Sequence, residues 1–152
     1  MQPADTSDQD SVRYTTLDGT QYWCVNNLLH RTDGPARIYS DGEQEWWLYG
    51  ERHRPDGPAV IGRYGEQQWW LYGQRHRTDG PAVIWGDASE WWYHSGVLHR
   101  SDGPAIIRSN HTCEWYQQGA HVTQQVQLWM HQRAVTWPWD DLTQAEFVLT
   151  WT

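Results

Sequence analysis

The sequence predicts an all-β repeat fold, an open antiparallel sheet of about five stacked β-hairpins followed by a short, helical C-terminal cap. Three observations predict it. The string His-Arg-x-Asp-Gly-Pro-Ala occurs four times with a spacing of 23 residues, a Trp and an Ile recur with the same spacing, and Gly-containing turn signals punctuate every repeat. The string begins at His30, His53, His76 and His99, the Trp row is Trp23, Trp46, Trp69, Trp92 and Trp115, and the Ile row is Ile38, Ile61, Ile84 and Ile107.

The chain of 152 residues divides into three segments. Residues 1–11 are polar and acidic, without the basic start or apolar stretch of a secretory signal, so we expect a disordered acidic tail. Residues 12–121 form the repeat array, and residues 122–152 form a Trp-rich C-terminal cap or interaction segment. The 13 Trp residues argue against wholesale disorder, and no apolar run approaches the ~18 residues of a membrane span.

Each repeat has room for two short strands, because it contains two turn signals. In the first full repeat we expect strands over Pro35–Ser40 and Glu43–Tyr49, with equivalents in the other repeats. Proline at a strand start is tolerated, since its missing N–H is not needed there. Cys24 and Cys113 lie four repeats apart, so an open sheet excludes a disulfide between them.

Alternation of side chains along a strand assigns residues to two faces. The Trp row, together with the Ala and Ile rows, is predicted to form the core. The opposite face varies along the array and is aromatic in the middle repeats, where Val60 and Val83 also belong to it. An exposed aromatic patch marks an interface, unless the C-terminal segment covers it. The candidate partner- or ligand-binding residues on this face are Trp47, Tyr49, Trp70, Tyr72, Trp85 and Tyr93.

After residue 121 the repeat pattern stops, and the spacing of apolar residues favours two helices. We expect the first over Val122–Val135 with Thr123 as N-cap, and the second over Asp140–Thr150 with Asp140 or Asp141 as N-cap. The apolar stripe of the second helix is predicted to be Leu142, Ala145 and Leu149.

The C-terminal tryptophans admit two interpretations. They either close the last hairpin as a cap or anchor a partner or a homodimer, since Trp is favoured at binding hot spots. The candidate partner-binding residues of this segment are Trp129, Trp137 and Trp139.

The His-Arg-x-Asp rows favour a structural role, because a catalytic site is normally unique and these groups recur four times. Asp before Gly suits a turn, Arg bridges bidentately to the Asp of its own or an adjacent repeat, and His donates to a backbone carbonyl. A His-Asp general base and a metal site are weaker alternatives, and no cofactor, metal or catalytic residue is predicted. A third alternative is anion binding by Arg31, Arg54, Arg77 and Arg100, which the Asp row would largely neutralise.

The 23-residue hairpin repeat, with its Gly turns and Trp strand, resembles the MORN-repeat class. The phrase His-Arg-x-Asp-Gly-Pro-Ala followed by Trp-Trp-x-x-Gly is similar to YwqK-like proteins, some labelled antitoxin components, and to proteins of bacteriophages and large viruses. The resemblance covers about residues 12–121. Standard MORN repeats are richer in Gly and Tyr and lack His-Arg-x-Asp. The resemblance implies a binding or scaffolding role and no known reaction.

We therefore expect a non-enzymatic repeat-sheet protein that binds a protein partner through the aromatic face and the Trp-rich C-terminus. The resemblance suggests a phage accessory or counter-defence inhibitor, or an immunity protein, acting in the cytoplasm (of the host cell, if phage-encoded). One alternative is a protein that binds or sequesters a nucleotide, and the weakest is a hydrolase with a His-Asp pair. The net charge of −8, with Arg as the only basic residue type besides His, argues against a general nucleic-acid binder.

Overall fold

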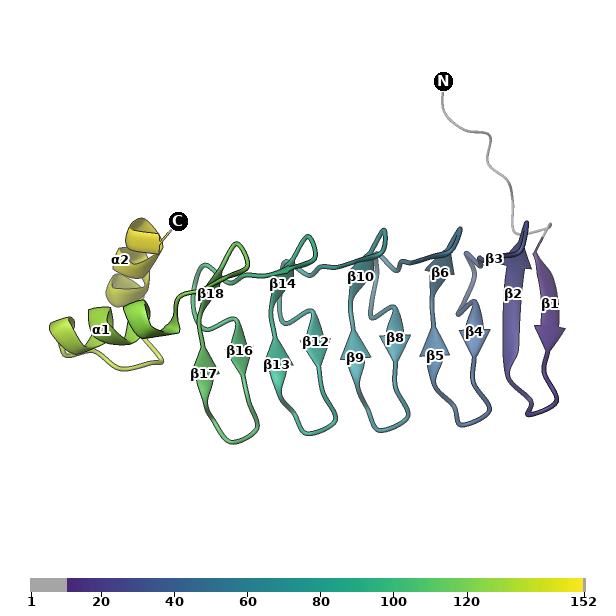
Figure 1. Ribbon diagram of the computed structural model, residues 1–152, viewed down its shortest axis with the longest axis horizontal. Helices are drawn as coiled ribbons and strands as arrows, with labels where there is room; N and C mark the ends of the chain where they lie inside the picture. The colour runs from purple at the N-terminus through teal and green to yellow at the C-terminus, as the bar shows by residue number, and fades with distance from the viewer. Residues whose placement is uncertain (1–10, 152) are drawn as a thin grey trace, which may run out of the picture. The chain divides into compact units, whose positions relative to one another are not determined.

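The structure is a computed structural model that describes residues 11–151 (Figure 1). The predicted disordered tail falls outside the described residues, except for Ser11. Contacts divide the chain into two compact units, residues 1–74 and 75–152, here called the N-terminal and C-terminal units. The predicted fold class is confirmed: repeated antiparallel strand pairs form an open sheet, and two helices follow at the C-terminal end.

In the N-terminal unit the sheet runs in the order β1-β2-β4-β5-β8-β9, with β3 paired to β2 and a separate hairpin of β6 and β7. All of these pairs are antiparallel. The strands are β1 (Val12–Thr15), β2 (Gln21–Val25), β3 (Leu28–Leu29), β4 (Arg37–Ile38), β5 (Gln44–Glu45), β6 (Trp47–Leu48), β7 (Glu51–Arg52), β8 (Val60–Ile61), β9 (Gln67–Gln68) and β10 (Trp70–Leu71), and β11 (Gln74–Arg75) falls at the unit boundary.

In the C-terminal unit the sheet runs in the order β12-β13-β16-β17, and two small hairpins, β14 with β15 and β18 with β19, accompany it. Two helices end the chain. The elements are β12 (Val83–Ile84), β13 (Glu90–Trp91), β14 (Tyr93–His94), β15 (Val97–Leu98), β16 (Ile106–Ile107), β17 (Cys113–Glu114), β18 (Tyr116–Gln117), β19 (Ala120–His121), α1 (Thr123–Arg133) and α2 (Asp141–Trp151).

In the four repeats after the first, the strands are shorter than predicted, because the second strand breaks at the recurring Trp, whereas β2 runs unbroken through Trp23. At Trp46 the backbone N–H donates to the carbonyl of Ala59 (2.8 Å) and the carbonyl accepts the N–H of His53 (3.1 Å). Trp46 therefore joins the sheet to the loop of the next repeat, and the chain continues as a second hairpin. Tyr49 lies in the tight turn of that hairpin, with φ 49° before Gly50 at φ 85°. The prediction that Tyr49 ends a strand and shares a face with Trp47 is therefore wrong.

The predicted core is correct for the Ala row, since Ala36, Ala59, Ala82 and Ala105 are 0% exposed, but the assignment of the two faces is wrong for the strand residues that follow. Within the sheets, Val60, Val83 and Ile106 are at most 4% exposed, whereas the Ile row is only half-buried. The expected variable face is thus the more buried one. The reason is visible at Glu45, whose register neighbours on this face are Arg37 and Val60. The second hairpin folds over it, placing the Trp47 and Arg52 side chains on the face opposite to the predicted core.

The predicted buried row of stacked tryptophans is correct only at its end. Trp115 is 3% exposed, but Trp23, Trp46, Trp69 and Trp92 are half-buried. Arginine covers these rings instead. The guanidinium carbon lies 4.2 Å from the ring centroid for Arg31 on Trp23, and 4.1 Å for both Arg54 on Trp46 and Arg100 on Trp92. A cation–π contact of this kind leaves the ring partly accessible.

The apolar core of the C-terminal unit lies where the helices meet the last repeat. Its buried members are Trp115, Val126, Trp129 and Phe147. Helix α1 begins after Val122, which makes no side-chain cap, while the Thr123 hydroxyl accepts the N–H of Trp115 (2.9 Å). The predicted Thr123 N-cap is therefore wrong, because its oxygen is used to join the helix to the sheet.

Helix α2 is capped by Asp140, whose Oδ1 accepts the N–H of Thr143 (2.8 Å). Asp140 is one of the two N-caps that the sequence predicted. The predicted apolar stripe of α2 is not the side of the helix that packs into the core. Phe147 is fully buried, whereas Leu142 and Leu149 are 83% and 87% exposed. The aromatic cluster decides this, since the Phe147 ring lies 4.5 Å from the Trp139 ring and 5.8 Å from the Trp129 ring.

Cys24 and Cys113 are free thiols. Among the described residues, neither helix has the length and apolarity needed to cross a membrane.

Candidate binding surface and the repeated loop

The string His-Arg-x-Asp-Gly-Pro-Ala forms a loop in each repeat, here called the repeated loop. This loop is closed by its own arginine. In the second repeat, Arg54 Nε donates to Asp56 Oδ1 (3.2 Å) and Nη1 donates to the carbonyl of Pro58 (3.1 Å). The Arg bridges to the Asp of its own repeat, and the predicted bidentate geometry is wrong because Nη1 is used on the Pro58 carbonyl. The same two bonds, with Nε–Oδ1 distances of 2.5–2.8 Å and Nη1–O distances of 3.3–3.4 Å, recur at Arg31, Arg77 and Arg100.

The Gly of the motif gives the arginine room to cross the loop. A Cβ at Gly57 would lie 3.1 Å from the Arg54 guanidinium carbon, and Gly34 and Gly80 show the same approach at 3.0 Å. Their φ angles do not require Gly, so space is the constraint. The motif order Arg-x-Asp-Gly-Pro is therefore explained by one packed arrangement of the guanidinium group.

The histidine of the motif accepts a hydrogen bond from the next repeat. His53 Nδ1 accepts the backbone N–H of Tyr72 (3.2 Å), 19 residues further on. The prediction that His donates to a carbonyl is therefore wrong. Because Nδ1 accepts a hydrogen bond, it carries no proton, and the ring is neutral. Burial lowers the pKa of both His53 and His99, and for His99 the nearby His94 lowers it further. The equivalent acceptors are His30 for Tyr49, His76 for Ser95 and His99 for Gln118, at 3.1–3.2 Å.

The loop contacts give no support to catalysis by a His-Asp pair, since His53 and Asp56 engage different partners. Within residues 11–151, no group of three His, Cys, Asp or Glu side chains is placed to hold a metal ion. The four candidate anion-binding arginines each contact a carboxylate of their own loop. Their charge is largely neutralised by that contact, which favours the structural role.

Two of the predicted surface tryptophans belong to a polar cluster of the N-terminal unit. Trp47 Nε1 donates to Glu45 Oε2 (3.0 Å), and Glu45, only 1% exposed, also accepts from Arg52. The Arg52 guanidinium carbon lies 5.1 Å from the Trp47 ring and 5.3 Å from the Trp70 ring. Both rings are half-buried.

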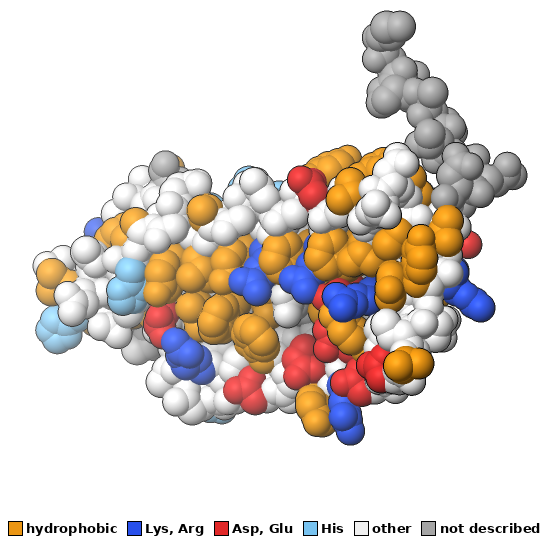
Figure 2. Space-filling view, turned by 45° about the vertical axis from the view of Figure 1, so that its right-hand side comes forward, with side chains coloured by type: hydrophobic (Ala, Val, Ile, Leu, Met, Phe, Trp, Pro, Cys, Tyr) orange, Lys and Arg blue, Asp and Glu red, His pale blue; other side chains and the backbone are white. Residues whose placement is uncertain are grey.

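Two of the predicted surface tyrosines are exposed, and each ring packs on a histidine of the repeated motif. Tyr49 and Tyr72 are 47% and 68% exposed. Their rings rest on the motif histidines, with centroids 4.0 Å from His30 and 4.3 Å from His53. Figure 2 shows the hydrophobic and arginine side chains that lie interspersed on one face. We call Trp47, Tyr49, Trp70 and Tyr72 the aromatic surface of the N-terminal unit.

The remaining predicted face residues lie in the C-terminal unit. Trp85 follows β12, and its ring meets Trp91 edge-on at 5.5 Å. Tyr93, in β14, has the Arg75 guanidinium carbon 5.3 Å from its ring. Both are half-buried.

The C-terminal tryptophans form the cap. Trp129 is 6% exposed, and the Trp139 ring lies 5.5 Å from Trp129 and 6.4 Å from Trp115. Trp137 lies against the last loop, so close that a Cβ on Gly103 would fall 2.5 Å from its ring. These residues pack the helices against the last repeat, and their contact with a partner stays a prediction.

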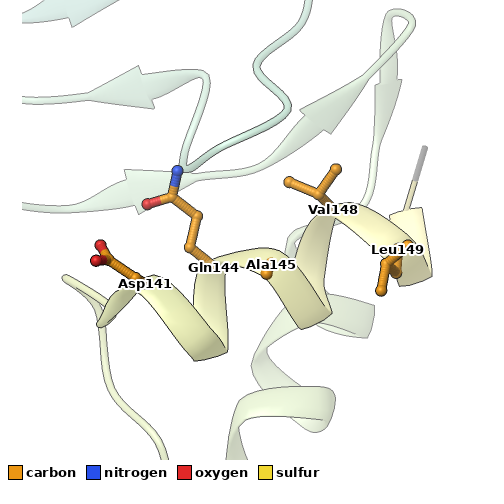
Figure 3. Close-up of a pocket in the computed structure, with 5 residues that line it drawn as sticks. All are labelled: Asp141, Gln144, Ala145, Val148 and Leu149. Carbon is orange, nitrogen blue, oxygen red and sulfur yellow. The ribbon is translucent and has the colours of Figure 1, made fainter.

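The outward side of α2 carries the stripe that the sequence assigned to the core. A shallow hollow of about 460 Å³ runs along this helix, lined by Asp141, Gln144, Ala145, Val148 and Leu149. Figure 3 shows Gln144 and Val148 pointing to the same side of the helix. The spacing of Leu142, Ala145 and Leu149 identified a helix face correctly but assigned it to the wrong environment.

The fold and the loop define a class: a repeat-sheet protein built of paired short hairpins and closed by a two-helix aromatic cap. No known protein-family model matches the chain, and no curated protein sequence matches it.

Proposed function

We propose that this is a non-enzymatic binding protein, and that the aromatic surface of the N-terminal unit recognises a protein partner. The observation that carries the proposal is the pair Tyr49 and Tyr72, exposed by 47% and 68% while each ring is seated on a histidine. Rigid, amphipathic aromatic side chains give large contact area for little loss of side-chain entropy on binding.

The repeated loop supports this division of roles. Its His, Arg and Asp side chains make hydrogen bonds within and between repeats, as at His53, Arg54 and Asp56. A scaffold stabilised in this way leaves the turn positions free to vary without loss of the fold. We infer that variation at these turns sets what the protein binds.

The likeness of the motif to MORN-type and YwqK-like repeats supports the same proposal, because that likeness implies binding or scaffolding. Within it, we propose the role of an inhibitor or an immunity protein that captures another protein. The partner's recognition surface is expected to be apolar at its centre, matching the two tyrosine rings.

The double variant Y49S/Y72S tests the proposal, with Y64S as its control. Ser95 occupies the equivalent turn position of the next repeat and still donates its N–H to His76 (3.1 Å), so serine fits the turn. Tyr64 is 73% exposed in a different turn. Immobilised wild-type protein, Y49S/Y72S and Y64S would be incubated with lysate from the native host, and captured proteins would be identified by mass spectrometry.

The expected result is a protein captured by the wild type and Y64S and lost, or weakened at least about tenfold, with Y49S/Y72S. Circular dichroism and urea unfolding establish that the double variant is folded. Equal capture by a folded Y49S/Y72S variant would rule out this surface as the binding site.

A further inference from the structure

A groove in the C-terminal unit lies between two neighbouring copies of the repeated loop. It has a volume of about 710 Å³, and the loops that begin at Arg77 and Arg100 both line it. Glu90, Trp92, His94 and His99 also face it. A volume of this size is within the range of sites that bind small molecules and short peptide segments.

This groove coincides with a break in the repeat's own pattern. Glu90 stands where the two preceding repeats have Gln44 and Gln67, and His94 stands where they have Leu48 and Leu71. Ser95 replaces the turn tyrosine.

The tyrosine that rests on the motif histidine in the two preceding repeats is therefore missing here. The His94 ring takes that place, 4.8 Å from His76, and lies 6.2 Å from His99. Since the loop contacts of Arg77 and Arg100 are the same as in the other repeats, these departures alter the groove and leave the loops intact.

The charges of the groove favour a cation. Its lining carries three carboxylates, on Asp79, Glu90 and Asp102, against two guanidinium groups. Asp79 and Asp102 each use Oδ1 on their own arginine and are 80% and 50% exposed, so their second oxygens remain accessible. Among the described residues, no Arg or His nitrogen lies within 4.0 Å of a Glu90 carboxylate oxygen.

The arrangement of the carboxylates does not favour a single metal ion. Over the described part of the chain, no cluster of acidic and imidazole groups is close enough to coordinate one metal ion. The acceptors therefore suit a larger, polyatomic cation with several donors. A guanidinium group has five N–H donors spread over a plane, whereas an ammonium group concentrates its charge at one point.

We propose that the groove binds a guanidinium group, with Glu90 as its principal anionic contact and Asp79 and Asp102 as flanking acceptors. The proposal goes beyond the partner binding proposed for the N-terminal unit. An arginine side chain of a peptide and free arginine share this chemistry, and the test separates them.

The test is an NMR titration of the full ¹⁵N-labelled chain at pH 7.5 and low salt. The probes are the capped peptide Gly-Arg-Gly, its citrulline analogue, and free arginine. Citrulline keeps the shape and removes the charge. Arginine probes are expected to shift the Trp92 indole and Ser95 amide signals saturably, and the citrulline peptide at least about tenfold more weakly. Tighter binding of the peptide assigns the group to a peptide chain, and equal binding assigns it to a small molecule.

Two variants assign the contact. E90Q removes the groove carboxylate and is expected to weaken binding by about tenfold. E51Q removes one charge outside the groove, at a position where the next repeat has Gln74, and is expected to leave binding within about twofold. The triple change E90Q/H94L/S95Y restores the residues of the preceding repeats, so it is expected to fold and to lose binding.

Equal affinity for arginine and citrulline, equal effects of E90Q and E51Q, or unaltered binding by the folded triple variant would each overturn the proposal. The absence of saturable shifts at millimolar arginine would overturn it as well. None of these outcomes bears on Tyr49 and Tyr72, because the peptide assay requires no protein partner.

Discussion

The histidine of the repeated motif is the residue that most directly couples one repeat to the next. His53 Nδ1 serves as an acceptor for Tyr72 N–H, and the same ring supports the Tyr72 side chain. A single neutral imidazole therefore holds both the backbone of the next turn and the exposed ring that we assign to partner binding. Protonation at Nδ1 would convert the acceptor into a donor and remove the bond.

This contact predicts a loss of stability below neutral pH. Burial lowers the folded-state pKa of His53 and His99 below the ordinary value of 6.5. The unfolded chain therefore takes up protons first as the pH falls. Their contribution is fully present above about pH 6.5 and is lost as the pH falls through the lower folded pKa values. Urea unfolding between pH 8 and pH 5 measures the effect.

The matched variant is H53N/H99N, in which the Asn Oδ1 atoms replace the Nδ1 acceptors but do not titrate. The free energy of unfolding is expected to fall less between pH 8 and pH 5 for this variant than for the wild type. Identical slopes for the two proteins would show that these histidines do not titrate on unfolding in the way described.

Individual residues also show what the sequence could not predict. The motif spacing located every loop, but the roles of its side chains depend on contacts between repeats. Tyr49 adopts φ 49°, a region that favours Gly, so the turn begins one residue before its Gly marker. Glu90 and His94 are visible in the sequence as departures from the repeat, and that signal could have located the groove.

At the scale of elements, the two-residue strands explain why the face assignment failed. Alternation holds only while the chain stays extended, and the break at Trp46 resets it before Trp47. The prediction of the apolar stripe of α2 failed for a related reason. The helix has apolar residues on more than one side, and the position of the Trp129–Trp139 cluster, which is tertiary information, selects Phe147.

The two sides of α2 are expected to differ sharply in stability. Phe147 is fully buried, so F147A should lower the free energy of unfolding by about 3–5 kcal/mol. Leu149 is 87% exposed, so L149S should change it by less than about 0.5 kcal/mol. Urea denaturation of the two single variants measures both values. Similar losses in both would contradict the orientation of α2.

At the scale of the whole molecule, one scaffold carries two different surfaces. The same loop contacts recur in both units, as at Arg54 and Arg100. The side chains at and near the turns differ between the units. The N-terminal unit has exposed tyrosines, and the C-terminal unit has the groove with Glu90 and His94. The repeat sheet was predictable from periodicity, whereas its functional surfaces arise where the repeats differ.

Hydrogen–deuterium exchange on the complex with the captured partner tests the central claim most directly. Binding through the aromatic surface predicts slower exchange at the turns containing Tyr49–Gly50 and Tyr72–Gly73, with little change at residues 31–35 and 54–58. Slower exchange confined to residues outside these turns, with the two tyrosine turns unchanged, would contradict the claim that this surface recognises the partner.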